Sequence, residues 1–196
     1  MANAYSSDSP DNELYFNFIT TGDEEPFRIL FDRYRSPLIL FIDDMVHNSD
    51  DAEDLMMDCF ARVISLQARY TGRNGASFKT WLFTIARNRT YSFLRRNGKD
   101  IQQSEPDMYV EADSTGNTNP DSKILKNERD IKLKAALDTL PADYRTALYL
   151  TYYENMRSVE IAQIMNKSIK QIYNLIARGK DRLRESLKED GYTWDI

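Results

Sequence analysis

The sequence predicts an all-α protein in which a flexible acidic linker joins two small helical domains. The 196-residue chain has only 7 Gly and 6 Pro, and they cluster between segments with helical apolar spacing, which favours helices over a many-turned β fold. Residues 100–122 carry acidic but no basic side chains and little apolar content, a composition typical of a linker. The predicted parts are an N-terminal arm at 1–21, a first domain at 22–99, the linker at 100–122, a second domain at 123–190 and a tail at 191–196.

Composition excludes several classes of site. The chain has one cysteine, Cys59, and one histidine, His47, so it cannot form an internal disulfide, and a Cys/His metal site is nearly excluded. We expect no metal and no cofactor, and an enzyme is the least favoured class because no nucleophile arrangement or phosphate-binding loop is present. The N-terminus does not resemble a signal peptide and no apolar run reaches spanning length, so we expect a cytoplasmic protein without membrane insertion.

The charges are segregated along the chain, although the net charge is only −5. Residues 43–58 carry only acidic charges, residues 59–99 only basic ones and residues 100–122 again only acidic ones, while residues 157–188 are mostly basic. Charge runs are often no more than solvated helix faces. Their ordered alternation favours two kinds of surface, an acidic one for a basic protein partner and basic ones for phosphates.

The first elements are predicted from apolar spacing. Residues 1–21 are expected to be a loose arm, although the apolar residues between positions 14 and 19 could pack as a short helix. Apolar residues over 27–45 recur at helical spacing, and Pro37 interrupts them. We therefore expect a helix, a break or kink at Pro37 and a second helix.

A helix over residues 50–69 follows, with N-cap chemistry supplied at 48–50. Its predicted core face holds Ala52, Leu55, Met56, Cys59, Val63 and Leu66. The far side holds Asp50, Asp54, Met57, Asp58 and Ala61. The helix dipole favours acids in the first turn, but this reason does not extend to Asp58, which lies two turns in.

After a loop over 70–77, Ser77 is expected to cap a helix over 78–96. Its predicted core arc holds Phe78, Leu82, Ile85, Ala86 and Phe93. Its opposite arc holds Thr80, Thr84, Arg87, Asn88, Tyr91 and Arg95. Cations, amide and hydroxyl donors and an aromatic ring on one face suit the binding of phosphates and of an exposed base.

The sequence pattern of the second domain predicts a helix-turn-helix. Its expected elements are a helix over 124–138, a helix opened by Pro141 and running through 153, a short helix over 159–165 capped by Ser158, a turn at 166–167, and a long helix capped by Ser168 that runs to about 189. A short helix, a tight turn and a second helix form the helix-turn-helix plan.

The last helix has a predicted buried face of Ile169, Ile172, Ile176, Gly179, Leu183 and Leu187. Polar residues project the other way near its N-terminus, namely Lys170, Gln171, Asn174 and Arg178. In this motif the N-terminal part of the second helix enters the major groove, where amides pair with adenine and cations with guanine. An ordinary helical hairpin with a polar exterior is the alternative.

Three parts of the chain together resemble the extracytoplasmic-function (ECF) sigma factors of the sigma-70 family. The run DAEDL at 51–55, continuing to residue 63, resembles their polymerase-docking helix. The run FKTWLFTIARN at 78–88, continuing to residue 96, resembles their promoter-opening helix. The runs LDTLP at 137–141 and EIA at 160–162, with residues 168–183, resemble their second DNA-binding region. The order, the spacing and the intervening acidic linker all agree.

The resemblance implies three partners, which are core RNA polymerase, promoter DNA and an anti-sigma factor. For the polymerase contact it implies Asp51, Asp54, Leu55, Met57 and Asp58. For the −10 element it implies Arg73, Asn74, Arg87, Asn88, Tyr91 and Arg95. For the −35 element it implies Ser168, Lys170, Gln171, Asn174 and Arg178. Met57 departs from the family pattern, in which a polar residue is usual at this place.

Two other functions remain as alternatives. A stand-alone helix-turn-helix regulator that never binds core polymerase would account for the second domain, but it leaves the acidic face around Asp54 and Asp58 without a purpose. A protein-binding helical adaptor would leave the polar face of the last helix unexplained.

Overall fold

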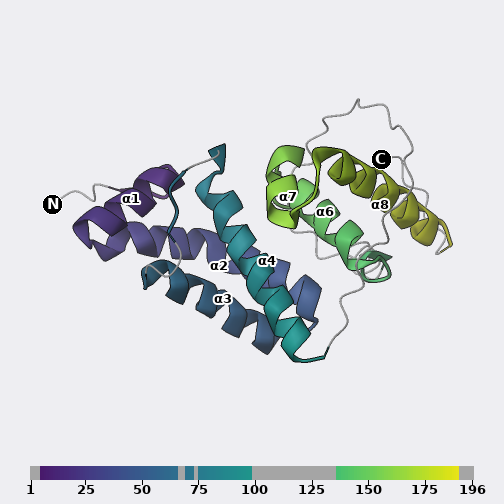
Figure 1. Ribbon diagram of the computed structural model, residues 1–196, viewed down its shortest axis with the longest axis horizontal. Coiled ribbons are helices and arrows are strands. Elements are labelled where there is room, and N and C mark those ends of the chain that lie inside the picture. Colours follow the sequence, from purple (N-terminus) through teal and green to yellow (C-terminus); the bar gives the residue numbers. More distant parts are fainter. Residues whose placement is uncertain (1–4, 66–68, 73–74, 99–135, 190–196) are drawn as a thin grey trace. The chain divides into compact units, whose positions relative to one another are not determined.

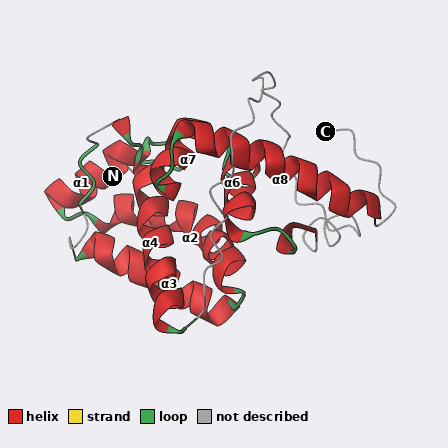
Figure 2. Cartoon of the chain, turned by 45° about the vertical axis from the view of Figure 1, so that its right-hand side comes forward, coloured by secondary structure: helices red, strands yellow, loops and turns green. Residues whose placement is uncertain are grey.

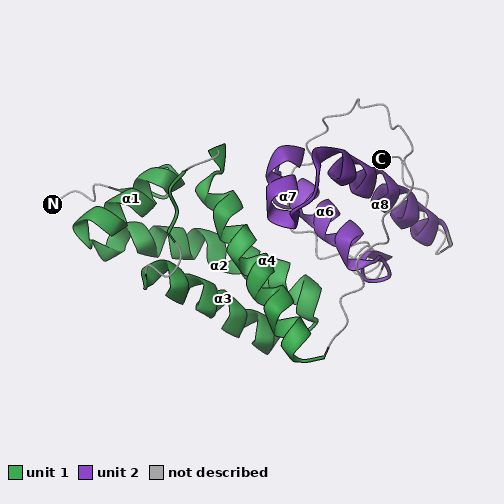
Figure 3. Ribbon diagram, in the orientation of Figure 1, with its two compact units in different colours: residues 1–99 green, residues 100–196 purple. Residues whose placement is uncertain are grey.

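The computed structural model describes residues 5–65, 69–72, 75–98 and 136–189 (Figure 1). Within these residues the regular elements are helices and there is no strand (Figure 2), so the predicted all-α fold is confirmed. The chain divides into two compact units, residues 1–99 and 100–196 (Figure 3). The predicted linker, the predicted helix up to residue 135 and the predicted tail lie outside the described residues. Over the described helices, none is both long enough and apolar enough to cross a membrane.

The first unit contains four described helices, α1 (Asp11–Thr21), α2 (Glu24–Val46), α3 (Ser49–Ile64) and α4 (Phe78–Arg96). Helix α2 packs against the other three, and α3 and α1 also contact α4 (Figure 1). The largest fully buried side chains come from all four helices and include Tyr15, Leu30, Phe41, Phe60 and Phe83. These helices therefore share one core.

Helix α1 occupies most of the segment predicted as a loose arm. Leu14 is 0% exposed and Tyr15 is 2% exposed, so the alternative of a short packed helix is the correct one. The helix ends at Gly22, which has a φ of 72° and whose N–H donates to the Phe18 carbonyl. A left-handed C-cap favours glycine because it lacks a Cβ.

Of the prediction at Pro37, the break and the separate second helix are wrong, because α2 runs from Glu24 to Val46 with Pro37 inside it. Proline in a helix interior removes one backbone hydrogen bond and costs about 3 kcal/mol. Buried side chains lie on both sides of it, Leu30 and Tyr34 before and Phe41 and Ile42 after. Burial of several such side chains, at roughly 1.5–3 kcal/mol each, outweighs that cost and keeps the helix continuous.

Helix α3 begins as predicted but ends earlier. The Asn48 side chain accepts a hydrogen bond from the Asp51 N–H at 3.0 Å, which caps the N-terminus. The helix ends at Ile64 rather than residue 69, and at this end the Ser65 N–H donates to the carbonyls of Ala61 and Val63.

Helix α4 has the predicted bounds, and Ser77 caps it by accepting a hydrogen bond from the Thr80 N–H at 3.1 Å. Its buried arc differs from the predicted one. The fully buried residues include Thr80, Phe83, Thr90 and Leu94, whereas Ile85 and Phe93 are half-buried. The arc is wider because α4 contacts three helices, and the buried Thr90 hydroxyl is satisfied by donating to the Ala86 carbonyl at 2.9 Å.

The second unit contains α6 (Ala142–Tyr152), α7 (Ser158–Met165) and α8 (Ile169–Glu189), which pack against one another. Ser158 is the first residue of α7 and not its cap. The Glu160 carboxylate instead accepts a hydrogen bond from the Arg157 N–H at 3.0 Å, which satisfies a donor that the helix leaves free. In α8, Ile169 of the predicted buried face is 45% exposed, whereas Leu175, which lies outside that predicted face, is buried.

Gly179 lies where α8 packs against α6, and a larger side chain at this position should clash with α6. A Cβ at this position would lie 3.1 Å from Leu148 Cδ1 and 3.4 Å from Tyr144 Cβ. We expect Gly179→Val to lower the free energy of unfolding of the second unit by about 1–3 kcal/mol, because the added side chain overlaps the facing helix. Urea denaturation followed by circular dichroism measures this. The exposed position Glu185 on the same helix gives the control Glu185→Val, and equal stability of the two variants would contradict the prediction.

Candidate functional site

The acidic residues predicted to contact a protein partner lie on α3, but they are not equivalent. Asp54 is exposed, Met57 is 53% exposed and Asp51 is half-buried. Leu55 is only 5% exposed and packs in the core. Its side chain is therefore not part of the exposed face. Around these positions the outward surface of α3 therefore combines carboxylates with the exposed apolar side chain of Met57.

Asp58 belongs to an ion-pair network inside the first unit. Its carboxylate accepts a hydrogen bond from the Arg62 Nε at 3.3 Å and another from the Arg89 Nε of α4. Its side chain remains 36% exposed. Arg89 thus joins α4 to α3. Asp58 has a structural role that the sequence did not reveal.

Cys59 is buried directly behind this network, and the environment makes it unreactive. Burial, together with the negative charge of Asp58, raises the pKa of its thiol to about 12, although Arg89 and Arg62 act the other way. The thiolate is the reactive form. We expect iodoacetamide at pH 8 to leave the folded protein unmodified and to alkylate it in urea, as mass spectrometry will measure.

The same pKa shift fixes a dependence of stability on pH. Because the folded state favours the neutral thiol, the contribution of Cys59 to the free energy of unfolding is complete below the unfolded-state pKa of 9.0 and is lost between pH 9 and about 12.

In the labelling experiment with iodoacetamide, the control Cys59→Ser should not be alkylated at all. Alkylation of folded protein as fast as that of unfolded protein would contradict the prediction.

The outer face of α4 presents a cation stacked on an aromatic ring. The Arg87 guanidinium carbon lies 4.3 Å from the centre of the Tyr91 ring, and Asn88 and Arg95 are exposed beside this pair. Within the described structure, the Arg87 Nε is buried and has no hydrogen-bond partner. Stacking orients the planar guanidinium, and such a face can bind phosphate and stack on a base. Thr80, predicted for this arc, is buried instead.

Arg73 and Asn74, predicted to contact the −10 element, lie outside the described residues. The residues that flank them are described. The Tyr70 hydroxyl donates to the Ala76 carbonyl at 2.9 Å, so the two ends of this loop are joined.

The helix-turn-helix of the second unit is formed by α7, a tight turn and α8. Asn166 has a φ of 53° and the Lys167 N–H donates to the Ala162 carbonyl at 3.0 Å, which closes the turn. The Lys167 Nζ lies 3.1 Å from the Asp143 Oδ2 of α6, a carboxylate with a 2% exposed side chain. This ion pair anchors the turn, and it could not be predicted from local pattern, which shows only an acid in the first turn of α6.

Ser168 and Gln171 form a reciprocal cap at the start of α8. The Ser168 hydroxyl accepts from the Gln171 N–H at 3.2 Å, and the Gln171 side-chain carbonyl accepts from the Ser168 N–H at 2.8 Å. Lys170 is exposed, and Asn174 and Arg178 are half-buried on the same helix. A capping box satisfies two helix-end donors, so two residues predicted to contact bases also hold the helix end.

Arg145 is a buried cation that sequence reasoning missed. It is 6% exposed, and its guanidinium donates to the carbonyls of Asp138 and Leu140, each at 3.3 Å. It satisfies carbonyls at the end of the helical turn that precedes α6, a place where cations are favoured. In the described parts of both units, no group of three or more His, Cys, Asp or Glu residues could hold a metal ion.

Comparison with known proteins finds matches in both units. The family model for sigma-70 region 2 matches residues 30–100, and the model for sigma-70 region 4 matches residues 130–183. The chain is 25% identical to the ECF RNA polymerase sigma factor SigW of Bacillus subtilis over 185 residues, which covers 87% of this chain and 94% of that protein. It is 24% identical to the ECF RNA polymerase sigma-E factor of Escherichia coli K12, covering 90% and 94% of the two chains.

A solved structure matches as well. The sigma factor RpoE of Bartonella quintana, solved in complex with the anti-sigma factor NepR, is 29% identical to this chain, with a TM-score of 0.61. The match covers 83% of this chain and 96% of that one.

Proposed function

The chain belongs to the ECF sigma factors of the sigma-70 family, and we propose which of its surfaces binds each partner. As a sigma factor it binds core RNA polymerase and recognises promoter DNA for transcription initiation. One observation carries this function, namely that regions 2 and 4 match in one chain, in that order. The stand-alone regulator is not favoured, because it gives region 2 no role.

The proposed contact with polymerase is the exposed part of α3. Asp51 and Asp54 supply negative charge and Met57 an exposed apolar side chain. Charge complementarity to a basic surface would steer association and fix the orientation of the partners. Asp58 takes part as well, although its ion pairs with Arg62 and Arg89 already offset its charge.

The proposed contact with the −10 element is the outer face of α4 together with the loop before it. The stacked pair of Arg87 and Tyr91 supports this role, with Asn88 and Arg95 exposed beside it. Aromatic rings and guanidinium groups bind exposed bases by stacking, and cations bind the phosphates. Arg73 and Asn74 stay part of this proposal on the ground of sequence alone.

The proposed contact with the −35 element is the N-terminal half of α8. Lys170, Asn174 and Arg178 would reach base edges in the major groove. Ser168 and Gln171 act here through the capping box, and the amide NH₂ group of Gln171 can still donate to a base or a phosphate.

We also propose that an anti-sigma factor holds the protein inactive, since the solved relative RpoE is bound to one. The protein would act in the cytoplasm, where polymerase and DNA are, and would catalyse no reaction itself. Co-elution with purified core polymerase in gel filtration tests the proposed polymerase contact. Specific DNA binding without co-elution would favour the stand-alone regulator.

A further inference from the structure

Helix α1 precedes the part of the chain that the region 2 model matches, since the match starts at residue 30 and α1 ends at Thr21. The structure nevertheless builds α1 into the first unit, where it packs against α2 and α4. Its contacts therefore indicate a role that the family match does not give.

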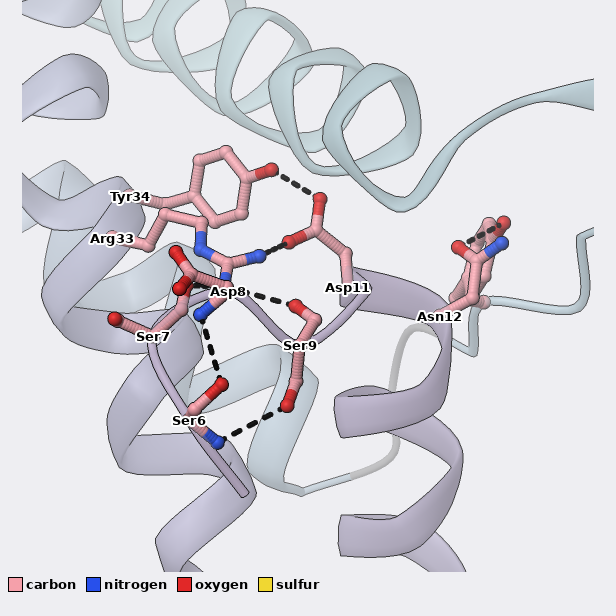
Figure 4. A network of polar contacts seen from close by, with 9 residues as sticks. Ser6, Ser7, Asp8, Ser9, Asp11, Asn12, Arg33 and Tyr34 are labelled. Atoms are coloured by element: carbon pink, nitrogen blue, oxygen red, sulfur yellow. Dashed lines mark hydrogen bonds and ion pairs between the residues drawn. The ribbon is translucent and has the colours of Figure 1, made fainter.

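The start of α1 is fixed to α2 by a polar network (Figure 4). The Asp11 carboxylate accepts hydrogen bonds from the Arg33 guanidinium and the Tyr34 hydroxyl, both on α2. Arg33 also donates to the backbone carbonyls of Ser7 at 2.5 Å and Ser9 at 3.0 Å. A part-buried, charge-assisted network of this kind defines position better than apolar packing alone.

Other residues of α1 form hydrogen bonds with Tyr70, which begins the loop before α4. The Tyr15 hydroxyl accepts a hydrogen bond from the Tyr70 N–H at 3.1 Å. The Tyr70 hydroxyl lies 2.9 Å from the Asn12 side chain and 2.9 Å from the Ala76 carbonyl. A hydroxyl has one proton, so it donates to Ala76, and the pair with Asn12 is satisfied when the amide NH₂ donates to the hydroxyl oxygen.

Tyr70 also joins an aromatic cluster at the start of α4. Its ring centre lies 5.6 Å from that of Tyr15, 5.7 Å from that of Phe78 and 5.6 Å from that of Trp81. Tyr70 is only 4% exposed. Burial, and then the negative charge of Asp11, raise the pKa of its hydroxyl, which keeps it protonated and able to donate. One side chain thus connects α1, both ends of the loop and the first turn of α4.

We propose that α1 is a positioning element for recognition of the −10 element, and that Tyr70 is the residue through which it sets the loop. This inference rests on the proposed function, in which the loop and α4 bind that element. Tyr70 is a positioning residue and not a DNA contact, because it is buried. A variant without this hydroxyl keeps the ring contacts but loses the hydrogen bonds to Ala76 and Asn12.

The test compares three full-chain variants that each lose one hydroxyl. Tyr70→Phe and Tyr15→Phe remove hydrogen bonds between α1 and the loop, and Tyr34→Phe removes a part-buried hydrogen bond of α1 that does not reach the loop. Each is mixed with core polymerase and a template pool in which the −10 element of an active promoter is randomised. The readout is the ratio of transcripts from preferred and disfavoured templates, which does not depend on the fraction of folded protein.

We expect Tyr70→Phe and Tyr15→Phe to lower this ratio roughly 3- to 10-fold, the effect of one or two lost hydrogen bonds, with core affinity unchanged. Tyr34→Phe should keep the wild-type ratio. Wild-type ratios in all three variants would overturn the inference and leave the proposed function intact. An equal loss in Tyr34→Phe would overturn the assignment to Tyr70, because the effect of α1 would then not depend on the hydrogen bonds that reach the loop. A wild-type protein without any −10 preference would overturn the proposed function, and this inference with it.

Discussion

Reversing the charge of Asp54 should lower the affinity for core RNA polymerase by about 100-fold or more. Asp54 is exposed on α3, so the lysine in Asp54→Lys costs the fold little. Placing a like charge against a basic partner surface costs several kcal/mol, and roughly 3 kcal/mol is about 100-fold in affinity. Binding of labelled protein to core polymerase, followed by fluorescence anisotropy, measures the loss, and circular dichroism reports the helical content.

The matched control for this variant is Glu53→Lys, the same charge reversal one residue earlier and off the predicted contact face. Glu53 is also exposed on α3. Equal affinity of both variants and the wild type would contradict the docking proposal. Asp58→Lys is a poorer test because it also removes the pairs with Arg62 and Arg89, so it would disturb the contact between α3 and α4 as well as any contact with polymerase.

Removing the Asn174 side chain should relax promoter preference at one base pair of the −35 element. A lost bidentate contact with a base costs roughly 1–3 kcal/mol of discrimination, about 5- to 150-fold. Asn174→Ala is the sharper test than Gln171→Ala, because the Gln171 side chain also caps α8, and its removal would mix lost capping with lost recognition. Transcription from a pool with a randomised −35 element measures the preference at each position.

Lys188→Ala serves as the control for the −35 prediction, because Lys188 is an exposed residue at the far end of the same helix. It should weaken binding slightly and equally for all sequences, through lost phosphate attraction. An Asn174→Ala variant that keeps the wild-type preference at every −35 position would show that this face of α8 does not read bases.

The sequence predicted those features that depend on local pattern. The bounds of α4 followed from a cap at Ser77 and a continuous helical segment, and the turn between α7 and α8 followed from Asn166 and Lys167. The capping of α8 by Ser168 was predicted as well. The reciprocal hydrogen bond, from the Ser168 N–H to the Gln171 side-chain carbonyl, was not predicted. Caps and turns involve residues a few positions apart, so the sequence itself brings them together.

Features that depend on distant residues could not be predicted in this way. Asp58 and Arg89 are 31 positions apart, and Tyr15 and Tyr70 are 55 positions apart. A helical wheel gives the direction of each side chain but not the element that it meets. The continuity of α2 through Pro37 has the same origin, because the core on both sides of the proline outweighs a local preference for a break.

Run-off transcription will show whether this chain directs core polymerase to promoters. The pure protein is mixed with bacterial core RNA polymerase and a library of genomic fragments, and the transcript starts are sequenced. We predict starts that share two upstream elements at −10 and −35 and that disappear when the protein is left out. Sequence-specific DNA binding without polymerase, and no new transcripts with it, would contradict the claim and leave a stand-alone regulator.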